Sequence, residues 1–217
     1  MTNFIREREA MVERQIAARG IREPAILAAF RQVPRHEFVS PEFSGAAYGD
    51  HALPIEASQT ISQPYIVALM IEAAEIGAED AVLEVGAGSG YAAAVISRIA
   101  LRVVAIERQQ QLVEIARERM MRLGYDNVMI VAGDGTMGWP DAAPYDAILA
   151  AASGSHIPQP LIDQLATGGR IVMPLGNSGS HQQLIKAVKM PDGSLRRSDL
   201  GGVRFVPLIG QEGWSDA

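Results

Sequence analysis

Two patterns of hydrophobic and polar residues divide this chain into a front section and a regular second part. Apolar residues recur among charges between positions 3 and 18, which predicts an amphipathic helix. Pro24 stands in a first-turn position and predicts a second helix over 24–30. Further prolines break up the stretch 31–60, which we expect to be rich in loops. The front section, residues 1–63, is therefore predicted to form a helical cap or a wall on the rest.

The second part, residues 64–217, alternates strands with helices. A helix is expected to open at Ser62-Gln63-Pro64, with Ser62 as its N-cap and Pro64 in its first turn. The predicted strands cover 82–85, 102–106, 127–131, 146–151 and 170–174, and the predicted helices cover 90–99, 109–122 and 159–165. This alternation predicts an α/β fold with a doubly wound, mostly parallel sheet and right-handed crossovers.

The end of the chain carries two more apolar runs, 183–188 and 203–208. They flank the turn sequence Pro191-Asp192-Gly193 and predict a closing antiparallel pair. With 48% hydrophobic and 20% charged residues among 217, the chain can bury a sizeable core. No repeat or linker interrupts the pattern, so we expect a single domain over 1–217.

The stretch from Val82 to Gly90 carries the strongest chemical signal. An apolar strand runs into three glycines at alternate positions and then into a helical pattern, which brings the backbone close to a nucleotide-like ligand. A dinucleotide fingerprint needs glycine at the place of Tyr91, and a phosphate-binding loop needs a lysine that is absent here. Acids stand on both sides instead, Glu84 before and Glu107 after. They favour a cation or a hydroxyl donor, and S-adenosylmethionine fits with its sulfonium, ammonium and ribose hydroxyls.

Each acidic candidate also has a purely structural interpretation. Glu107 ends a predicted strand 21 positions after Gly86, where it can accept ribose hydroxyls or simply stabilise a helix first turn. Asp134 lies between two glycines and can accept from an adenine amino group or form an ordinary Asp-Gly turn. Glu84 can accept backbone N–H groups or face the positive end of the cofactor. Because parallel strands end at one edge of a sheet, we expect these positions to meet there.

Composition narrows the partners and the compartment. A net charge of -6 argues against tight binding to nucleic acid, where lysine and arginine must neutralise phosphates. The absence of cysteine excludes disulfides and cysteine-ligated metals, and the four histidines are scattered outside ligand spacing, so no metal is expected. A polar N-terminus and the lack of a membrane-length apolar run predict a cytoplasmic protein.

Six short segments follow one another in an order typical of one known family. They are Ala47-Tyr48-Gly49-Asp50, Gln59-Thr60-Ile61-Ser62-Gln63-Pro64, Leu83-Glu84-Val85-Gly86-Ala87-Gly88-Ser89-Gly90-Tyr91, Gly133-Asp134-Gly135-Thr136-Met137-Gly138-Trp139, Gly168-Gly169-Arg170 and Val203-Arg204-Phe205-Val206-Pro207-Leu208. Together they resemble the protein-L-isoaspartate (D-aspartate) O-methyltransferases over positions 11–208. The glycine motif is shared by many methyltransferases, whereas the segment around Ser62 is much more specific.

The resemblance implies a class I, Rossmann-like, S-adenosylmethionine-dependent methyltransferase. Such an enzyme transfers a methyl group to the free carboxylate of L-isoaspartyl and D-aspartyl residues in damaged proteins and peptides, and it leaves S-adenosylhomocysteine. It repairs proteins, because the ester closes to a succinimide whose hydrolysis returns some normal aspartate. The expected partners are therefore damaged proteins and peptides, without nucleic acid or membrane, and the chain is expected to act as a monomer.

The resemblance also implies roles for particular positions. Ser62 matches the active-site serine and is expected to hold the substrate carboxylate. The expected cofactor contacts are Ile61, Gln63, Glu84, Gly86, Gly88, Gly90, Glu107, Asp134, Gly135 and Ala151. The expected substrate contacts, besides Ser62, are Val206, Pro207 and Leu208.

Other functions compete with this interpretation. The stretch 151–156 departs from the family, which supports a methyltransferase acting on a small-molecule carboxylate. A protein that binds the cofactor or damaged peptide without turnover is the non-enzymatic alternative, and intact Ser62, Glu107 and Asp134 argue against it. A dehydrogenase is the weakest alternative, because Tyr91 breaks its fingerprint.

Overall fold

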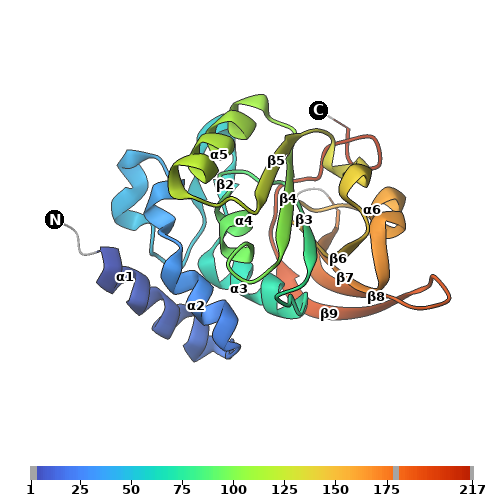
Figure 1. Cartoon of the computed structure of the whole chain (residues 1–217), viewed down its shortest axis with the longest axis horizontal. Helices are drawn as coiled ribbons and strands as arrows, with labels where there is room; N and C mark the ends of the chain where they lie inside the picture. Colours follow the sequence, from blue (N-terminus) through green and yellow to red (C-terminus); the bar gives the residue numbers. More distant parts are fainter. Residues whose placement is uncertain (1–3, 178–180, 216–217) are drawn as a thin grey trace.

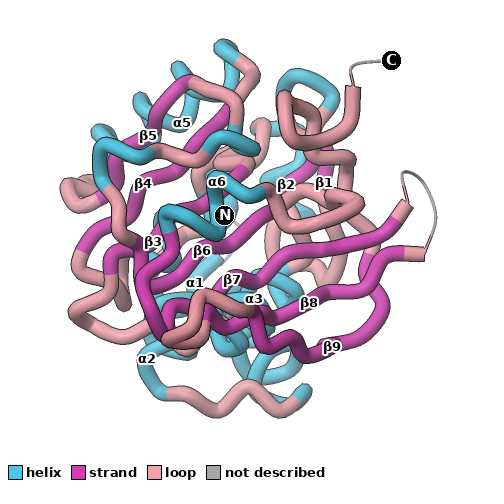
Figure 2. Tube along the Cα trace, turned by 90° about the vertical axis from the view of Figure 1, so that its right-hand side faces the viewer, coloured by secondary structure: helices cyan, strands magenta, loops and turns pink. Residues whose placement is uncertain are grey.

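The centre of the molecule is a seven-stranded sheet in the order β5-β4-β3-β6-β7-β8-β9 (Figure 1). The computed structural model describes residues 4–177 and 181–215, so the outermost residues of the expected 1–217 domain lie outside it. The strands are β3 (Ala81–Val85), β4 (Arg102–Glu107), β5 (Val128–Ala132), β6 (Tyr145–Ala150), β7 (Leu165–Gly176), β8 (Gln182–Lys189) and β9 (Leu195–Val203). Figure 2 shows these strands following one another across the sheet.

Strand direction and order place a ligand crevice beside β3. The strands from β5 to β7 in this order pair in parallel, while β8 and β9 extend the sheet antiparallel. The chain runs outward from β3 through β4 to β5 and then returns to the other side of β3 as β6. Because the connections diverge at this point, an open space forms outside the carboxyl ends of β3 and its neighbours.

Helices cover both faces of the sheet (Figure 1). They are α1 (Phe4–Met11), α2 (Pro24–Gln32), α3 (Pro64–Ala73), α4 (Tyr91–Ile96), α5 (Gln110–Leu123) and α6 (Gln159–Gln164). In β3, Val82 packs into the apolar cluster under α3, α4 and α5, while Leu83 and Val85 pack into the cluster under α6. Strands buried on both faces read as continuous apolar runs, which is why the sequence pattern predicted β3, β4 and β6 to within a residue or so. β5 was predicted equally well, whereas β7 begins five residues before the predicted 170–174.

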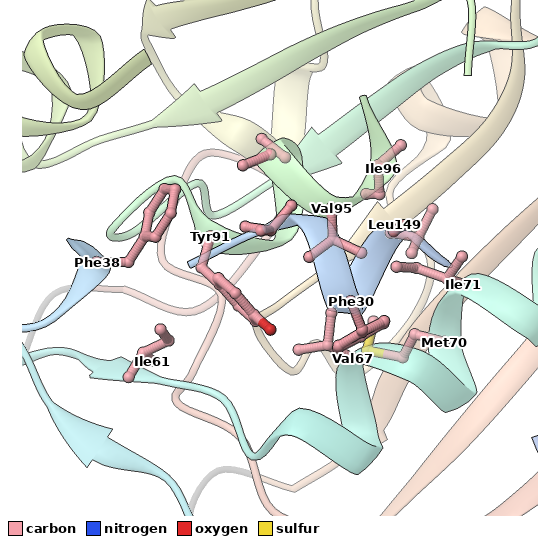
Figure 3. Close-up of a cluster of buried hydrophobic side chains, with 14 of the residues drawn as sticks. Phe30, Phe38, Ile61, Val67, Met70, Ile71, Tyr91, Val95, Ile96 and Leu149 are labelled. Carbon is pink, nitrogen blue, oxygen red and sulfur yellow. The ribbon is translucent and has the colours of Figure 1, made fainter. Parts of the chain in front are cut away.

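The front section shares its core with α3 and α4. After α1 it continues through a π-helical turn and several short 3-10 helices, and β1 (Leu53–Pro54) pairs with β2 (Thr60–Ile61). Figure 3 shows Phe30 and Phe38 of the front section beside Tyr91 of α4. Both rings meet Tyr91 edge-on, with centroid distances of 6.2 and 5.5 Å. The apolar cluster is therefore continuous from the front section into the sheet.

The predicted second closing strand is wrong. Residues 203–208 do not form it, and the strand that pairs with β8 is β9, Leu195–Val203. The turn between them lies where the sequence predicted it, with Met190 N donating to Ser194 O at 2.8 Å. β9 is the edge strand and is mostly exposed, so its polar residues carry no apolar alternation from which a strand could be recognised.

A shared core predicts a single cooperative unfolding transition. Phe38→Ala should lower the free energy of unfolding by about 3–5 kcal/mol, because it empties a fully buried ring site in the front section. The reporter is tryptophan fluorescence, since Trp139 packs against the opposite cluster. The control is Ile5→Ala, whose side chain is 66% exposed and which should change little. An unchanged midpoint for Phe38→Ala would mean that the front section unfolds separately.

Candidate active site

A cavity of about 1080 Å³ lies outside the carboxyl ends of β3, β4 and β6. Its other walls come from the serine segment, residues 59–63, and from the wall segment, residues 202–209. Twelve of the residues expected at the site line it: Ile61, Ser62, Gln63, Glu84, Gly86, Gly88, Glu107, Gly135, Ala151, Val206, Pro207 and Leu208. Tertiary structure thus gathers positions that lie up to 147 residues apart, from 61 to 208, around one space.

The glycine turn between β3 and α4 forms the floor of the cavity. Gly86 and Gly88 have φ values of +90° and +52°, which side chains rarely adopt. The amides of Gly86 and Ala87 both donate to the carbonyl of Ile106 at 2.9 Å, so the turn is tied to the end of β4. A Cβ atom on Gly135 would lie 2.5 Å from the Val85 side chain, so the next turn also needs glycine to pack on β3. Bare backbone therefore faces the cavity.

Two buried carboxylates face this space. Glu107 accepts hydrogen bonds from the amides of Gly88 and Gln109, each at 2.9 Å. Glu84 is 2% exposed, and its Oε2 atom has no hydrogen-bond partner among the described residues. Burial, and then the charge of Glu107, raise the pKa of Glu84 to about 8, against the lowering effect of the Ala93 backbone.

The donor set fits a cationic cofactor with hydroxyl groups. A cation beside Glu84 and Glu107 relieves the repulsion between the two acids and satisfies the unpaired Glu84 oxygen. Each Glu107 oxygen keeps a free lone pair after its backbone bond and can accept a ribose hydroxyl. The bare glycine backbone leaves room for close approach.

Ser62 lies between β2 and α3 with its hydroxyl free. The prediction that it caps α3 is wrong, because Gln63 is the N-cap residue, with ψ at 136°. Pro64 forces the residue before it into an extended conformation, which leaves Ser62 one position outside the helix. The Gln63 side chain turns to Asp50, whose Oδ1 it contacts at 2.8 Å. No hydrogen bond joins the Ser62 hydroxyl to another described residue, so it can donate to a ligand.

The wall segment is fixed by two groups that the sequence did not single out. The buried Gln182 amide clasps the backbone of Phe205, accepting from its N–H at 2.7 Å and donating to its carbonyl at 3.0 Å. Ser153 donates its N–H to Val206 O and accepts from Leu208 N, both at 2.8 Å. Ser153 belongs to the stretch 151–156, which departs from the family pattern, so this stretch helps to hold the wall segment in place. In the sequence, the only sign of a special role for Gln182 is its position as a polar residue directly before an apolar run.

Asp134 and Gly90 do not line the cavity. The Asp134 carboxylate accepts from Thr136 N and Oγ1 at 2.9 and 2.7 Å and from Gln211 N at 2.7 Å, so it secures the C-terminal segment. Burial raises its pKa, but these hydrogen bonds outweigh burial and leave the pKa lowered. A Cβ on Gly90 would lie 2.8 Å from Met120 Cε, so glycine at this position serves packing against α5. Their contact with a cofactor stays a prediction.

In the part of the chain that the structure describes, no group of three or more histidine, aspartate or glutamate side chains is arranged to hold a metal ion. None of the helices in the same ranges combines the length and the apolar character that crossing a bilayer requires.

The buried Glu84 predicts a pH-dependent stability. Its folded pKa of about 8 lies above the ordinary value of 4.5, so between these values the folded chain keeps a proton that the unfolded chain has lost. The contribution of Glu84 to stability therefore falls as pH rises through this window, by about 1.4 kcal/mol per pH unit at most. Urea unfolding between pH 5.5 and 8.5 should show a steeper decline for the unmodified protein than for Glu84→Gln. Exposed Glu79→Gln is the matched control, and equal slopes for all three proteins would contradict the assignment.

Comparison with known proteins agrees with this geometry. Residues 6–213 match the family model described as protein-L-isoaspartate(D-aspartate) O-methyltransferase. A protein-L-isoaspartate O-methyltransferase 2 of Pelobacter propionicus is 54% identical over 207 residues, which cover 95% of this chain and 92% of that protein. A protein-L-isoaspartate O-methyltransferase 1 of Rhodopseudomonas palustris is 52% identical over 214 residues, covering 99% and 87% of the two chains.

Solved structures give the same result at the level of the fold. A protein-L-isoaspartate O-methyltransferase superposes with a TM-score of 0.87 at 31% identity, covering 94% of this chain and 66% of that one. A Plasmodium falciparum protein of the same description, in complex with S-adenosyl-L-homocysteine, superposes with a TM-score of 0.80 at 24% identity and covers 93% and 98%. The family match spans nearly the whole chain and includes the glycine turn, the serine segment and the wall segment. This chain therefore belongs to the protein-L-isoaspartate (D-aspartate) O-methyltransferase family.

Proposed function

We propose that this protein transfers a methyl group from S-adenosylmethionine to the free carboxylate of L-isoaspartyl and D-aspartyl residues in damaged proteins and peptides. The observation that carries the proposal is a single cavity that joins two buried acids to a free serine hydroxyl. The acidic part suits a sulfonium cofactor, and the serine suits a carboxylate acceptor. The products are a methyl ester and S-adenosylhomocysteine.

The proposed cofactor contacts follow the cavity wall. Glu107 accepts the ribose hydroxyls, and Glu84 accepts from the ammonium group. The backbone of Gly86 and Gly88 lies against the cofactor, and the remaining proposed contacts are Ile61, Gln63, Gly135 and Ala151, with Asp134 and Gly90 as outer positions. When bound, S-adenosylmethionine supplies a methyl group activated by the positive sulfur. The protein needs no general base to activate the acceptor, because the carboxylate is already ionised at neutral pH.

Ser62 is proposed to position the acceptor. A carboxylate is ionised at pH 7 and is already a nucleophile, so the main task is to place it in line with the methyl group. The Ser62 hydroxyl donates to one carboxylate oxygen and leaves the other oxygen pointing at the methyl group. The Ser62 hydroxyl makes no hydrogen bond to another described residue, so none has to break when it donates to the substrate.

The wall segment is proposed to receive the peptide around the damaged residue. Val206, Pro207 and Leu208 line the cavity, and Val206 is 38% exposed. Recognition through the extended main chain demands few particular side chains, which suits many different damaged proteins. We also propose that the chain works as a monomer in the cytoplasm and folds as a single domain, and the core that the front section shares with the sheet supports the single domain.

A paired-peptide assay tests the proposed reaction. The protein should transfer radiolabelled methyl groups from S-adenosylmethionine to an isoaspartyl peptide and not to the aspartyl peptide of the same sequence, because only the misplaced carboxylate reaches Ser62. Small carboxylates such as free dicarboxylic acids should accept no label. Labelling of the small acids alone would favour the small-molecule alternative, and equal labelling of both peptides would refute recognition of isoaspartate.

The role of Ser62 has its own prediction. A hydrogen bond to a charged acceptor contributes about 1.5–3 kcal/mol, so Ser62→Ala should reduce kcat/KM for the isoaspartyl peptide by about 10- to 100-fold. The affinity for S-adenosylhomocysteine, measured by calorimetry, should change by less than about threefold, which corresponds to a change in binding free energy on the order of RT. An effect confined to the cofactor would place Ser62 in the cofactor site instead.

A further inference from the structure

Arg35 is a fully buried cation directly behind the serine segment. It opens the short helix Arg35–Phe38 of the front section and is 0% exposed. Its Nε donates to the carbonyl of Ala47 and its Nη2 donates to the carbonyl of Ser62, both at 2.8 Å. One guanidinium therefore ties the serine segment to a loop 15 residues earlier, from position 47 to 62.

No carboxylate of the described chain balances this charge. The ion pairs found in residues 4–177 and 181–215 do not include Arg35, and its Nη1 atom lacks a hydrogen-bond partner there. The guanidinium carbon lies 4.7 Å from the centre of the Tyr91 ring, and the groups that act on its charge are the Tyr91 and Tyr48 phenols. Burial lowers the pKa of Arg35, but an arginine stays protonated at neutral pH.

The other buried arginine among the described residues has an acidic partner. Arg119 is 8% exposed and contacts Glu56 at 3.3 Å, and the half-buried Arg170 contacts Asp80 at 2.6 Å. A buried charge without a partner opposes folding, since its hydration is lost and no counter-charge replaces it. Of the two buried arginines in the described ranges, Arg35 alone lacks an acid, and it lies behind the residue proposed to hold an anion.

We propose that Arg35 is a positioning residue that holds the Ser62 backbone and supplies the positive charge that selects an ionised carboxylate at the Ser62 hydroxyl. The inference rests on the proposed function, because the anion is the free α-carboxylate of the isoaspartyl residue. The substrate carboxylate acts as the counter-charge of Arg35, with the Ser62 backbone between the two groups. The cation is fully buried and lies over the Tyr91 ring, so water screens its attraction to the carboxylate less than it would at the surface.

The direction of the effect follows from the charges that the reaction removes. The carboxylate is negative when it binds and becomes a neutral ester, so its attraction to Arg35 is strongest before methyl transfer. Arg35 therefore favours binding of the substrate rather than the chemical step. Removal of its charge should raise KM for the peptide more than it lowers kcat.

Equilibrium binding tests the charge without turnover. Calorimetry with S-adenosylhomocysteine present compares an isoaspartyl peptide with the isoasparaginyl peptide, in which a neutral amide replaces the carboxylate. The unmodified protein should prefer the carboxylate at least tenfold. Arg35→Met should reduce this preference to threefold or less, and Arg35→Lys, which keeps the charge, should restore most of it. Should Arg35→Met fail to fold, Arg35→Gln removes the same charge while keeping a donor for one carbonyl.

Arg170→Met is the matched control. Arg170 also donates to two carbonyls, of Ala74 and Glu75, at 2.7 and 2.6 Å, but neither of these two residues lines the cavity, whereas Ser62 does. Its loss should lower thermal stability and leave the carboxylate preference unchanged. A preference that survives in Arg35→Met, or one that falls equally in Arg170→Met, would overturn the proposal.

A measurement on the unmodified protein needs no variant. An isoaspartyl peptide labelled with carbon-13 at its free α-carboxyl reports the pKa of that group by NMR, with S-adenosylhomocysteine bound. A cation behind Ser62 should hold the pKa of the bound carboxyl below that of the free peptide, and a raised pKa would refute the inference. If the unmodified protein neither binds nor methylates the isoaspartyl peptide, the proposed function itself fails. If it does both and only these charge effects are missing, Arg35 alone was misassigned.

Discussion

The site depends on two buried carboxylates at one edge of the sheet, where burial and the charge of Glu107 make Glu84 harder to ionise. Glu84 stands one position before the end of β3, and Glu107 ends β4. Parallel pairing sets Val85 opposite Ile106, so the two strands deliver their acids to the same edge of the sheet. Repulsion and burial keep the pKa of Glu84 near 8, and a positively charged ligand relieves both effects. The negative charges of Glu84 and Glu107 beside the glycine turn therefore disfavour a pyrophosphate ligand and favour a cationic one.

The other half of the cavity is built from segments that lie far apart in the chain and are held by backbone hydrogen bonds. Arg35 binds the carbonyl of Ser62, and Gln182 and Ser153 bind the backbone between Phe205 and Leu208. Such bonds fix the path of the chain but not the side chains that face the cavity. A rigid path with few obligatory side chains suits a substrate set that shares one altered carboxylate and little else.

The predictable part of the fold was the part buried on both sides. β3, β4 and β6 appear in the sequence as continuous apolar runs because helices cover both faces, and their positions were predicted to within a residue or so. β9 was placed too late, because an exposed edge strand carries no apolar alternation. The N-cap of α3 was misplaced by one residue, since Pro64 makes Gln63 the boundary and excludes Ser62 from the helix.

By itself, the sequence determined the strand, the glycine turn, the flanking acids and the serine segment, because each is a local pattern whose geometry follows from neighbouring residues. Only the tertiary structure decided the partners of individual polar groups. Asp134 binds the backbone of the C-terminal segment, Gly90 packs against α5, and Arg35 lies buried without an acid behind Ser62. An aspartate or an arginine is compatible with many partners, and burial among segments distant in the chain selects one. The charge that a site presents to its ligand is therefore a property of packing rather than of composition.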